Sequence, residues 1–529
     1  MHWSDVPPIR PETHFGRVMR CFADRPLNLN AMFADAVARQ RDREALVDGA
    51  QRLDYAKLDR IADRFAGHFH RLGLAREDRI ALFLGNEREF VYALLATLRL
   101  GAIVVPVNVR EQRPELTFIL NQCGAKAIAF DVALTDRLPA PADVPALSVR
   151  LSVGGAAPGA IAFDELLETP SPEAPRADPA EEEPAAILYT SGTTGRPKGA
   201  MLTHLNVIHS VLHYRFCMLL TSADRSVLAV PASHVTGLVA IILAMLAVGG
   251  CVIVLREFKA RGFLELAARE RMTHTLVVPA IYNLCLRDPD FGRFDLSPWR
   301  VGGFGGAPMP EGTIRTLAER LPGLTLMNAY GATETTSPTT IMPMGRQAAN
   351  LDSVGVVVPC GDVRVMNDSG RAVAPGEPGE LWIAGPMVVP GYWENPDATA
   401  REFAGGYWKS GDIGSIDAQG FVRVFDRKKD MINRGGYKIY SAEVESVLSL
   451  HPLVVESALI AVPDPVLGEK THAFVVTREA GSAELLRTHC AQHLADYKVP
   501  DFFTLRTEPL PRNANGKLLK RALRESRSG

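Results

Sequence analysis

Hydrophobic and polar positions near the start of the chain change repeatedly between a helical and a strand-like spacing. Residues 55–72 and 87–100 place apolar side chains at helical intervals. Residues 79–84 and 103–107 are short apolar runs, and Gly101 separates the second helical segment from the second run. Strands and helices that alternate over this length predict βαβ units and a mainly parallel sheet.

An uncharged stretch at residues 238–255 approaches the length of a membrane span. Gly249 and Gly250 divide it into an Ala/Leu/Ile half and a Cys-Val-Ile-Val-Leu half. Because paired glycines interrupt regular elements, we interpret the stretch as a buried helix, a glycine turn and a buried strand. The alternating pattern around it, through residues 205–310, includes a short strand at residues 227–230, which Pro231 ends.

Two changes in composition indicate how the chain is divided. Residues 169–184 are rich in proline, alanine and acidic side chains, which predicts an exposed connector between two subdomains of one large N-terminal body. After the charged run at residues 426–430, about 100 residues carry their own pattern of elements, a size usual for a domain. We therefore predict an N-terminal domain at residues 1–426 and a small, mobile C-terminal domain at residues 427–529.

The C-terminal part has patterns of both kinds. Residues 454–462 and 471–477 are predicted strands, and residues 442–450 and 483–495 are predicted helices, the first with Ser441 as its N-cap. The predicted fold class is α/β. A large N-terminal body of mainly parallel sheets flanked by helices is followed by a small α+β domain.

Length and composition narrow the functional classes. The 529 residues are too many for one core, and 47% hydrophobic with 22% charged residues is typical of a soluble globular protein. A net charge of -2 leaves no basic excess for a nucleic-acid partner. Seven cysteines without a C-x-x-C pair argue against a disulfide framework and a zinc site. With no apolar signal segment at residues 1–10, we expect a cytoplasmic protein without a membrane span.

The segment Tyr-Thr-Ser-Gly-Thr-Thr-Gly-Arg-Pro-Lys-Gly at residues 189–199 concentrates groups that bind phosphate. Glycines let backbone N–H groups converge on an anion, hydroxyls add donors, and a lysine adds positive charge. A flexible surface loop can have this composition too, but an apolar strand at residues 185–188 leads directly into the segment. The spacing is not that of the Walker motif. The predicted polyphosphate loop comprises Thr190, Ser191, Gly192, Thr193, Thr194 and Lys198.

This segment resembles the phosphate-loop signature of the adenylate-forming superfamily, which comprises acyl-CoA synthetases, nonribosomal-peptide adenylation domains and firefly-type luciferases. Further motifs of that family follow in the family's order, so that the resemblance extends from residue 53 to residue 524. The resemblance implies ATP and a carboxylic acid as substrates, Mg²⁺ as the metal ion, and coenzyme A as the co-substrate.

Two motifs resemble the family's nucleotide site. The sequence Tyr-Gly-Ala-Thr-Glu at residues 330–334 is similar to the motif in which Tyr330 stacks on adenine, Thr333 binds the α-phosphate and Glu334 binds Mg²⁺. Taken alone, it is equally an ordinary turn into a helix. A glycine-rich stretch at residues 302–308 is the second. The resemblance assigns ATP and AMP binding to Gly305, Gly306, Ala307, Pro308, Asn328, Ala329, Tyr330, Gly331 and Thr333.

Further roles follow from the resemblance towards the C-terminus. It implies that Asp412 and Arg427 contact the ribose, that Lys429 is the hinge, and that Gly435, Gly436 and Tyr437 line the coenzyme A tunnel. Lys517 matches the lysine that enters the active site during adenylation, where a cation stabilises the developing negative charge. The predicted catalytic residues are Lys517, Glu334, Thr194 and His234.

His234 falls at the family's gate between the adenylate and the thiol tunnel, although a single histidine in an apolar stretch is more often a core residue. No acidic side chain occurs at residues 233–236, which disfavours an amino-acid substrate. His209 and His213 lack an H-E-x-x-H pattern and are predicted to be structural. The predicted lining of the acid pocket consists mostly of small or apolar residues, which suggests a fatty or aryl acid: Val235, Thr236, Gly237, Phe304, Gly306 and Ala332.

The predicted activity is that of an ATP-dependent carboxylic acid:CoA ligase, which forms an acyl-adenylate and then a thioester. Three alternatives stay open: a stand-alone adenylating enzyme that loads a carrier protein, an inactive nucleotide-binding scaffold, and an oxygenase of the luciferase kind. The identity of the acid, the pathway and the oligomeric state, a homodimer included, stay open as well.

Overall fold

The computed structural model describes residues 3, 6–190, 196–479, 481–512 and 518–525. The chain forms two compact units. Unit 1 contains Met1–Val363 and Ile383–Trp408, and unit 2 contains Arg364–Trp382 and Lys409–Gly529. The predicted domain boundary at residue 426 lies inside unit 2, in strand β23 (Phe421–Arg427). The boundary, and the hinge at Lys429, stay predictions.

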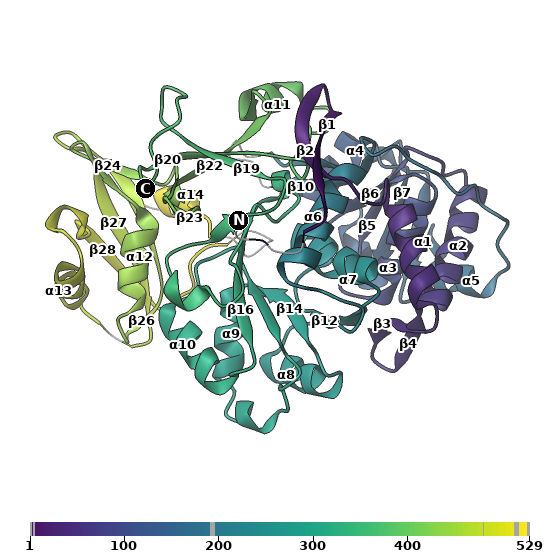
Figure 1. Ribbon diagram of the computed structural model, residues 1–529, viewed down its shortest axis with the longest axis horizontal. Helices are drawn as coiled ribbons and strands as arrows, with labels where there is room; N and C mark the ends of the chain where they lie inside the picture. The colour runs from purple at the N-terminus through teal and green to yellow at the C-terminus, as the bar shows by residue number, and fades with distance from the viewer. Residues whose placement is uncertain (1–2, 4–5, 191–195, 480, 513–517, 526–529) are drawn as a thin grey trace. The chain divides into compact units, whose positions relative to one another are not determined.

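The first sheet of unit 1 contains the predicted βαβ repeats, and every neighbouring pair from β10 to β9 is parallel. In sheet order, its strands are β11 (Lys198–Thr203), β10 (Pro184–Thr190), β6 (Ile103–Pro106), β5 (Arg79–Phe83), β7 (Ala127–Asp131), β8 (Val149–Val153) and β9 (Ile161–Ala162). Its helices are α2 (Tyr55–Arg71), α3 (Arg88–Arg99), α4 (Arg113–Cys123) and α5 (Phe163–Glu168). Figure 1 shows strands β5, β6 and β7 together with these helices. Fully buried side chains such as Phe83, Val105 and Ile128 form the core of this sheet.

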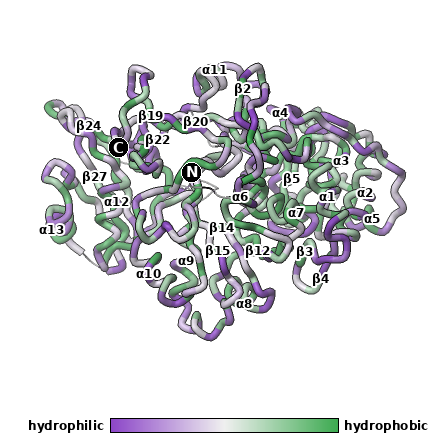
Figure 2. Tube along the Cα trace, viewed as in Figure 1, coloured by the Kyte–Doolittle hydropathy of each residue, from purple (hydrophilic) through white to green (hydrophobic). Residues whose placement is uncertain are grey.

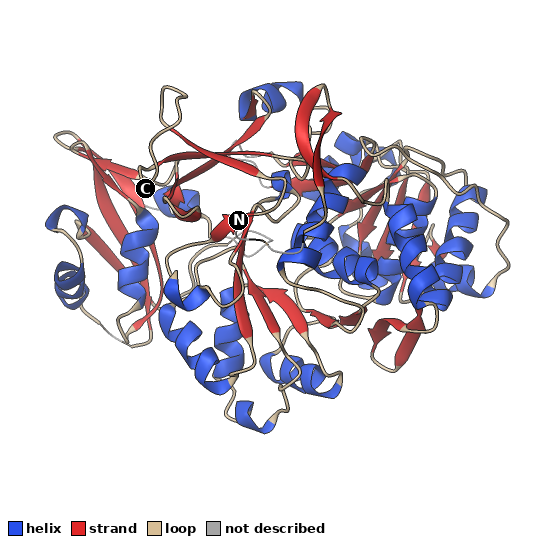
Figure 3. Ribbon diagram, in the orientation of Figure 1, coloured by secondary structure: helices blue, strands red, loops and turns tan. Residues whose placement is uncertain are grey.

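The second sheet of unit 1 has a parallel centre from β16 to β3. In sheet order, its strands are β18 (Gly355–Val357), β17 (Thr340–Ile341), β16 (Thr325–Tyr330), β15 (Val301–Phe304), β14 (His274–Val277), β12 (Arg225–Leu228), β13 (Cys251–Val254), β3 (Glu44–Asp48) and β4 (Gln51–Asp54). The helices along this part of the chain are α1 (Leu29–Gln40), α6 (His204–Cys217), α8 (Ala260–Arg269), α9 (Pro279–Leu286) and α10 (Glu311–Arg320). Figure 3 shows this alternation of helix and strand, which confirms the predicted fold class.

The uncharged stretch at residues 238–255 folds as the glycine pair predicts. A π-helix, η3 (Thr236–Leu243), continues into α7 (Ala244–Val248), and Gly249 turns the chain with a φ of +79° into β13. Figure 2 colours this region as strongly hydrophobic, and its side chains lie in the core of unit 1. Within the described ranges, no helix is both long enough and apolar enough to cross a membrane.

The proline-rich connector is exposed, as expected, but it does not join two subdomains. It leads from α5 to β10, and β9 and β10 belong to the same sheet. The connector crosses the helices of that sheet: the Ala177 N–H donates to the Arg99 carbonyl at 2.9 Å. A Cβ atom at Gly67 would lie 2.0 Å from the Pro172 carbonyl oxygen, so glycine permits the crossing. The sequence missed this because the contacts are made with residues about 100 positions earlier in the chain.

Unit 2 contains two groups of paired strands. One follows the order β19 (Asp362–Met366), β20 (Gly379–Ala384), β22 (Tyr407–Ile416) and β23. The other follows the order β25 (Tyr437–Ile439), β24 (Ile432–Arg434), β27 (Gly468–Thr477) and β26 (Val454–Asp464), and β28 (Phe502–Arg506) runs parallel to β27. The helices are α12 (Ser441–Ser449), α13 (Ala483–His493) and α14 (Lys520–Glu525). The predicted strands and helices of this unit are confirmed.

One detail of unit 2 corrects the sequence analysis. The N-cap of α12 is Tyr440, and Ser441 is the first helical residue. The Ser441 N–H donates to the Asp426 carboxylate, which thus supplies the acceptor that a cap would have supplied. The Ser441 hydroxyl accepts a hydrogen bond from Lys520. Short elements complete the described chain: α11 (Pro396–Glu402), β21 (Phe403–Ala404), η1 (Val132–Arg137), η2 (Pro141–Asp143), η4 (Phe291–Arg293), η5 (Thr333–Thr335), η6 (Gln347–Ala349) and η7 (Asp496–Lys498).

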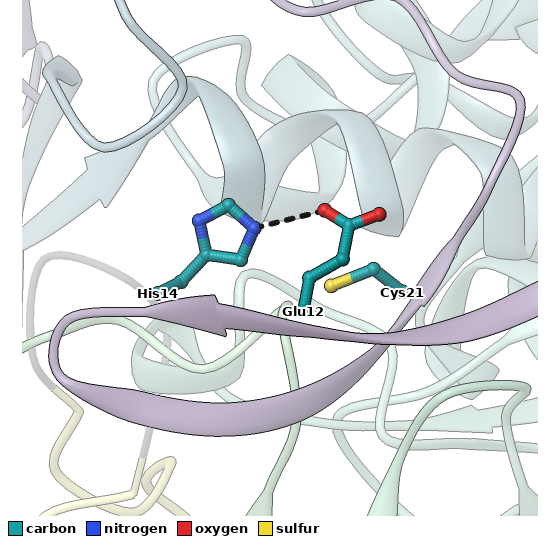
Figure 4. A group of neighbouring side chains, drawn as sticks. All are labelled: Glu12, His14 and Cys21. Carbon is teal, nitrogen blue, oxygen red and sulfur yellow. Dashed lines mark hydrogen bonds and ion pairs between the residues drawn. The ribbon is translucent and has the colours of Figure 1, made fainter.

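A two-stranded hairpin, β1 (Ile9–His14) and β2 (Arg17–Phe22), precedes these sheets. Glu12, His14 and Cys21 come together on it (Figure 4) and are the one group of possible metal ligands among the described side chains. Arg25 already binds both oxygens of Glu12, at 3.0 and 2.6 Å. Burial raises the pKa of the Cys21 thiol to about 12. The group is an ion-pair anchor of the hairpin.

Replacing Arg25 by Ala should destabilise unit 1 by about 3–5 kcal/mol, because two partly buried carboxylates, Glu12 and Glu181, would lose a guanidinium that is 3% exposed. The hydrogen bond from Arg25 holds the pKa of Glu12 below its ordinary value. The stabilisation is therefore present at neutral pH and is lost as the pH falls through that lowered pKa. Urea denaturation at pH 7.5 and pH 3 measures both effects.

The matched control is Arg10→Ala. Arg10 pairs with the same carboxylate, but its side chain is 62% exposed, so the loss should stay below about 1 kcal/mol. Equal losses for the two variants would contradict the assignment of the anchor to Arg25.

Candidate active site

Three strands of unit 1 end in the segments that the sequence singles out. β15 and β16 are parallel neighbours with Phe304 opposite Asn328, so the glycine run and the Tyr-Gly-Ala-Thr-Glu motif leave the same edge of one sheet. β10 belongs to the other sheet and ends at Thr190. The Thr190 hydroxyl lies 3.4 Å from the Glu334 carboxylate, and this contact brings the ends of the two sheets together. Such carboxyl edges of parallel sheets are the usual ligand sites of α/β folds.

The glycine run after β15 leaves the backbone bare at this edge. A Cβ atom at Gly305 would lie 2.3 Å from the Ala329 carbonyl oxygen, so no larger residue fits between β15 and β16. Gly306 has a φ of +75°. Gly306, Ala307 and Pro308 are exposed, whereas Asn328 and Ala329 are buried. A ligand can therefore approach the main chain directly here.

Glu334 is a buried carboxylate, 7% exposed, on the short helix η5. Its Oε1 accepts a hydrogen bond from the Tyr392 hydroxyl at 3.0 Å, in addition to the Thr190 contact. Carboxylate and hydroxyl oxygens are the ligands that Mg²⁺ prefers, so the donor set of Glu334 and Thr190 fits this ion. Tyr330, Ala332 and Thr333 are half-buried beside it and Gly331 is exposed.

Lys198, at the start of β11, is not directed as the phosphate-loop prediction expects. Its ammonium group is 2.6 and 2.7 Å from the two oxygens of Glu402, and it lies 4.3 Å above the ring of Tyr392. The residue is 8% exposed. Its charge is thus balanced inside unit 1, and phosphate binding by Lys198 stays a prediction. Burial would raise the pKa of Glu402, but hydrogen bonds from Lys198 and Tyr392 outweigh this and hold it below its ordinary value.

In unit 2, strand pairing brings the two predicted ribose contacts together. Asp412 on β22 lies opposite Arg427 on β23, and the Arg427 Nε is 2.8 Å from the Asp412 carboxylate. Asp412 is only 4% exposed. Lys429 is exposed, and so are Gly435 and Gly436, which have φ angles of +60° and +92°. Tyr437 stacks on Tyr497 with ring centroids 4.7 Å apart and is 60% exposed.

Comparison with known proteins decides the family. Residues 33–393 match the family described as AMP-binding enzyme, and residues 443–517 match the AMP-binding enzyme C-terminal domain. The chain belongs to the AMP-binding enzyme family. This result confirms the resemblance to the adenylate-forming superfamily.

Full-length relatives place this AMP-binding enzyme in the acyl-CoA ligase branch. A long-chain-fatty-acid–CoA ligase of Yersinia pestis is 34% identical over 535 residues, which cover 95% of each chain. A feruloyl-CoA synthase of an Amycolatopsis species is 35% identical over 492 residues, which cover 91% of this chain and 95% of that one. The structure of an o-succinylbenzoate CoA synthetase from Bacillus subtilis in complex with its acyl-adenylate intermediate has a TM-score of 0.83, with 29% identity and coverage of 93% and 97%. The protein is an AMP-forming acid–CoA ligase.

In this AMP-binding enzyme, the loop that carries His234 is fixed by a residue that the sequence analysis missed. The Asn86 side-chain amide donates to the carbonyls of Leu228, Val230 and Leu255 at 3.0–3.1 Å and accepts from the Ala232 N–H at 2.8 Å. His234 itself reaches solvent, and its Nδ1 accepts from the Thr236 N–H at 3.2 Å. Only a long-range contact identifies Asn86, so no local signal could have found it.

The predicted acid pocket is packed more tightly than its small side chains suggest. Val235 and Phe304 are 3% and 1% exposed, and a Cβ atom at Gly237 would lie 2.2 Å from the Pro231 carbonyl oxygen. Thr236 is half-buried. Their contact with substrate stays a prediction. His209 is fully buried with both ring nitrogens within hydrogen-bond distance of backbone groups, which confirms its structural role.

Several predicted site residues lie outside the described residues: Ser191, Gly192, Thr193, Thr194 and Lys517. Their roles stay predictions. The sequence analysis missed Tyr392, which contacts both Lys198 and Glu334, and Glu402, which pairs with Lys198. A buried lysine requires an acidic partner, but nothing in the local sequence tells which of 60 acidic residues supplies it.

Replacing Gly305 by Ala should weaken AMP binding about tenfold or more, because the added methyl group would push β15 away from β16 at the bare edge. Equilibrium titration with AMP measures the change. The control is Gly312→Ala on α10, where a Cβ atom meets nothing within 4 Å, so affinity should be unchanged. An unaltered affinity in the Gly305 variant would contradict the assignment of this edge to the nucleotide.

Proposed function

We propose that this ligase joins a fatty or aryl carboxylic acid to coenzyme A through an acyl-adenylate, and that the shared edge of β10, β15 and β16 is where adenylation occurs. The observation that carries the proposal is the buried Glu334 carboxylate, which is held beside Thr190 and follows β16, the parallel neighbour of the strand that ends in the exposed glycine backbone. Relatives named for long-chain fatty acids and for ferulate support the two acid classes.

In the first half-reaction, the substrate carboxylate attacks the α-phosphorus of ATP and pyrophosphate leaves. Glu334 and Thr190 would hold Mg²⁺, which supplies positive charge to the phosphate oxygens when bound; a relative's structure contains ATP with a magnesium ion. The exposed backbone at Gly306 accommodates the nucleotide, Tyr330 stacks on adenine, and Asp412 accepts from the ribose hydroxyls. Lys517 neutralises charge that develops between the two anions.

In the second half-reaction, the thiol of coenzyme A attacks the acyl carbon and AMP leaves. The C-terminal domain turns about Lys429, so that Lys517 withdraws and the loop with Gly435 and Gly436 guides the thiol. Both glycines are exposed with left-handed φ angles, which a loop with a close main-chain approach requires. His234, whose ring reaches solvent, serves as the gate between adenylate and thiol. A cytoplasmic location and a homodimer stay predictions.

A panel of fatty and aryl acids of graded length, assayed for pyrophosphate release with and without coenzyme A, tests the proposed function. We expect release with at least one acid and an acyl-CoA product that needs coenzyme A. Release without any thioester product would favour the carrier-protein alternative. Absence of both ATP binding and pyrophosphate release across the panel would remove the proposal and favour the inactive scaffold.

Replacing Lys517 by Ala should slow adenylation by at least about 100-fold, since one charge-stabilising group would be lost from the transition state. Thioester formation from supplied acyl-AMP should be spared, because Lys517 has withdrawn at that stage. Single-turnover assays of the two half-reactions measure the split. Equal losses in both would contradict the swinging-domain account. Lys438→Ala, in the same unit and exposed, is the control for removal of a positive charge.

A further inference from the structure

The hydroxyl group of Tyr392 lies among three charged groups inside unit 1. It is 3.0 Å from Glu334 Oε1, 2.6 Å from Glu402 Oε2 and 3.3 Å from the Lys198 ammonium nitrogen. The residue is 2% exposed. Its main chain is fixed beside the strand of Lys198, because Tyr392 forms a β-bridge with Ala200 and the next N–H, of Trp393, donates to the Gly199 carbonyl at 2.7 Å.

The number of protons makes this arrangement unusual. A phenol has one proton to donate, and two carboxylates lie within reach of it. The ordinary pKa of a phenol is about 10, so the hydroxyl has its proton at neutral pH. Lys198 donates to the phenol oxygen. The single O–H can therefore serve Glu334 or Glu402, but not both at once.

The two carboxylates differ in the other hydrogen-bond donors that contact them. Glu402 receives two charge-assisted hydrogen bonds from the Lys198 ammonium, whereas Glu334 Oε1 has the more distant Thr190 hydroxyl at 3.4 Å. Glu334 thus depends more on Tyr392 for its orientation. When Glu334 turns its oxygens to a cation, the hydroxyl can turn to Glu402 without leaving a buried charge unpaired.

We infer that Tyr392 is a positioning residue: its hydroxyl alternates as donor between Glu334 and Glu402, orients Glu334 for a divalent cation, and links that cation to the buried Lys198–Glu402 pair. This inference rests on the proposed function, in which Glu334 holds Mg²⁺. Groups that orient metal ligands in this way affect metal affinity about 10–100-fold. We expect the change in the affinity for the metal-nucleotide complex, and not in the affinity for the nucleotide without metal.

Tyr392→Phe tests the inference with a minimal change. Phenylalanine keeps the ring that lies 4.3 Å from the Lys198 ammonium and 5.8 Å from the Phe403 ring, so the packing and the fold should persist. Titration calorimetry with α,β-methylene-ATP and Mn²⁺, without acid, should show metal-nucleotide affinity reduced about 10–100-fold. AMP affinity in EDTA should change less than about twofold, and in turnover the Mg²⁺ requirement should rise more than kcat falls.

The matched control is Tyr55→Phe. Tyr55 is also fully buried, and its hydroxyl donates to the Gly250 carbonyl at 2.7 Å. Gly250 precedes β13, which is four strands away from β16 in the second sheet, whereas Glu334 follows β16. Removing that hydroxyl should leave Mn²⁺-nucleotide affinity unchanged. Unchanged metal affinity in Tyr392→Phe, or an equal loss of AMP affinity, would overturn the inference. If the wild-type enzyme bound no metal-nucleotide and activated no acid, the proposed function itself would fail, and the two failures are thus distinguishable.

Discussion

A buried positive charge must have a negative partner, and Lys198 meets this constraint by pairing with the partly buried Glu402 in unit 1. The two residues are about 200 positions apart in the chain, so the pair fixes the start of β11 against the end of α11. Through the Tyr392 hydroxyl the same charge balance extends to Glu334, and through Glu334 to Thr190 at the end of β10. One electrostatic requirement therefore positions both sides of the edge that we propose for the nucleotide.

At the loop of His234, buried polar groups of the backbone also need partners, and an uncharged side chain supplies them. Asn86 satisfies three carbonyl oxygens and one N–H group where the chain leaves β12 and β13 without regular pairing. Backbone groups at such strand ends cannot be left unpaired when they are buried. The amide oxygen of Asn86 accepts from the one N–H group, and its two N–H hydrogens are shared among the three carbonyl oxygens. The irregular backbone at the loop of His234 is thus held by side-chain hydrogen bonds in place of strand pairing.

Local patterns predicted the parts of the fold that depend on neighbouring residues. The periodicity of residues 55–72 and 79–84 is a property of one face of one element, and α2 and β5 form there. Glycine pairs predicted the turn before β13 for the same reason. Local patterns could not predict contacts between residues distant in the chain. These are the crossing of the connector over Gly67, the Asp426 carboxylate at the start of α12, and the acid that neutralises Lys198. Glu334 was found because its motif is contiguous, whereas Tyr392 supports it from 58 positions away.

The composition of unit 2 has a consequence for how the protein could be recombined with its relatives. Residues 364–382 belong to that unit although they lie between segments of unit 1, so the chain passes between the units three times. A chimaera made by exchanging only the sequence after residue 426 would combine β19, β20, β22 and all of β23 except Arg427 from one parent with the rest of unit 2 from the other. It would also place Asp412 and Arg427, which face each other across β22 and β23, on sequences of different origin. Exchange of a whole folding unit therefore requires a cassette in two pieces.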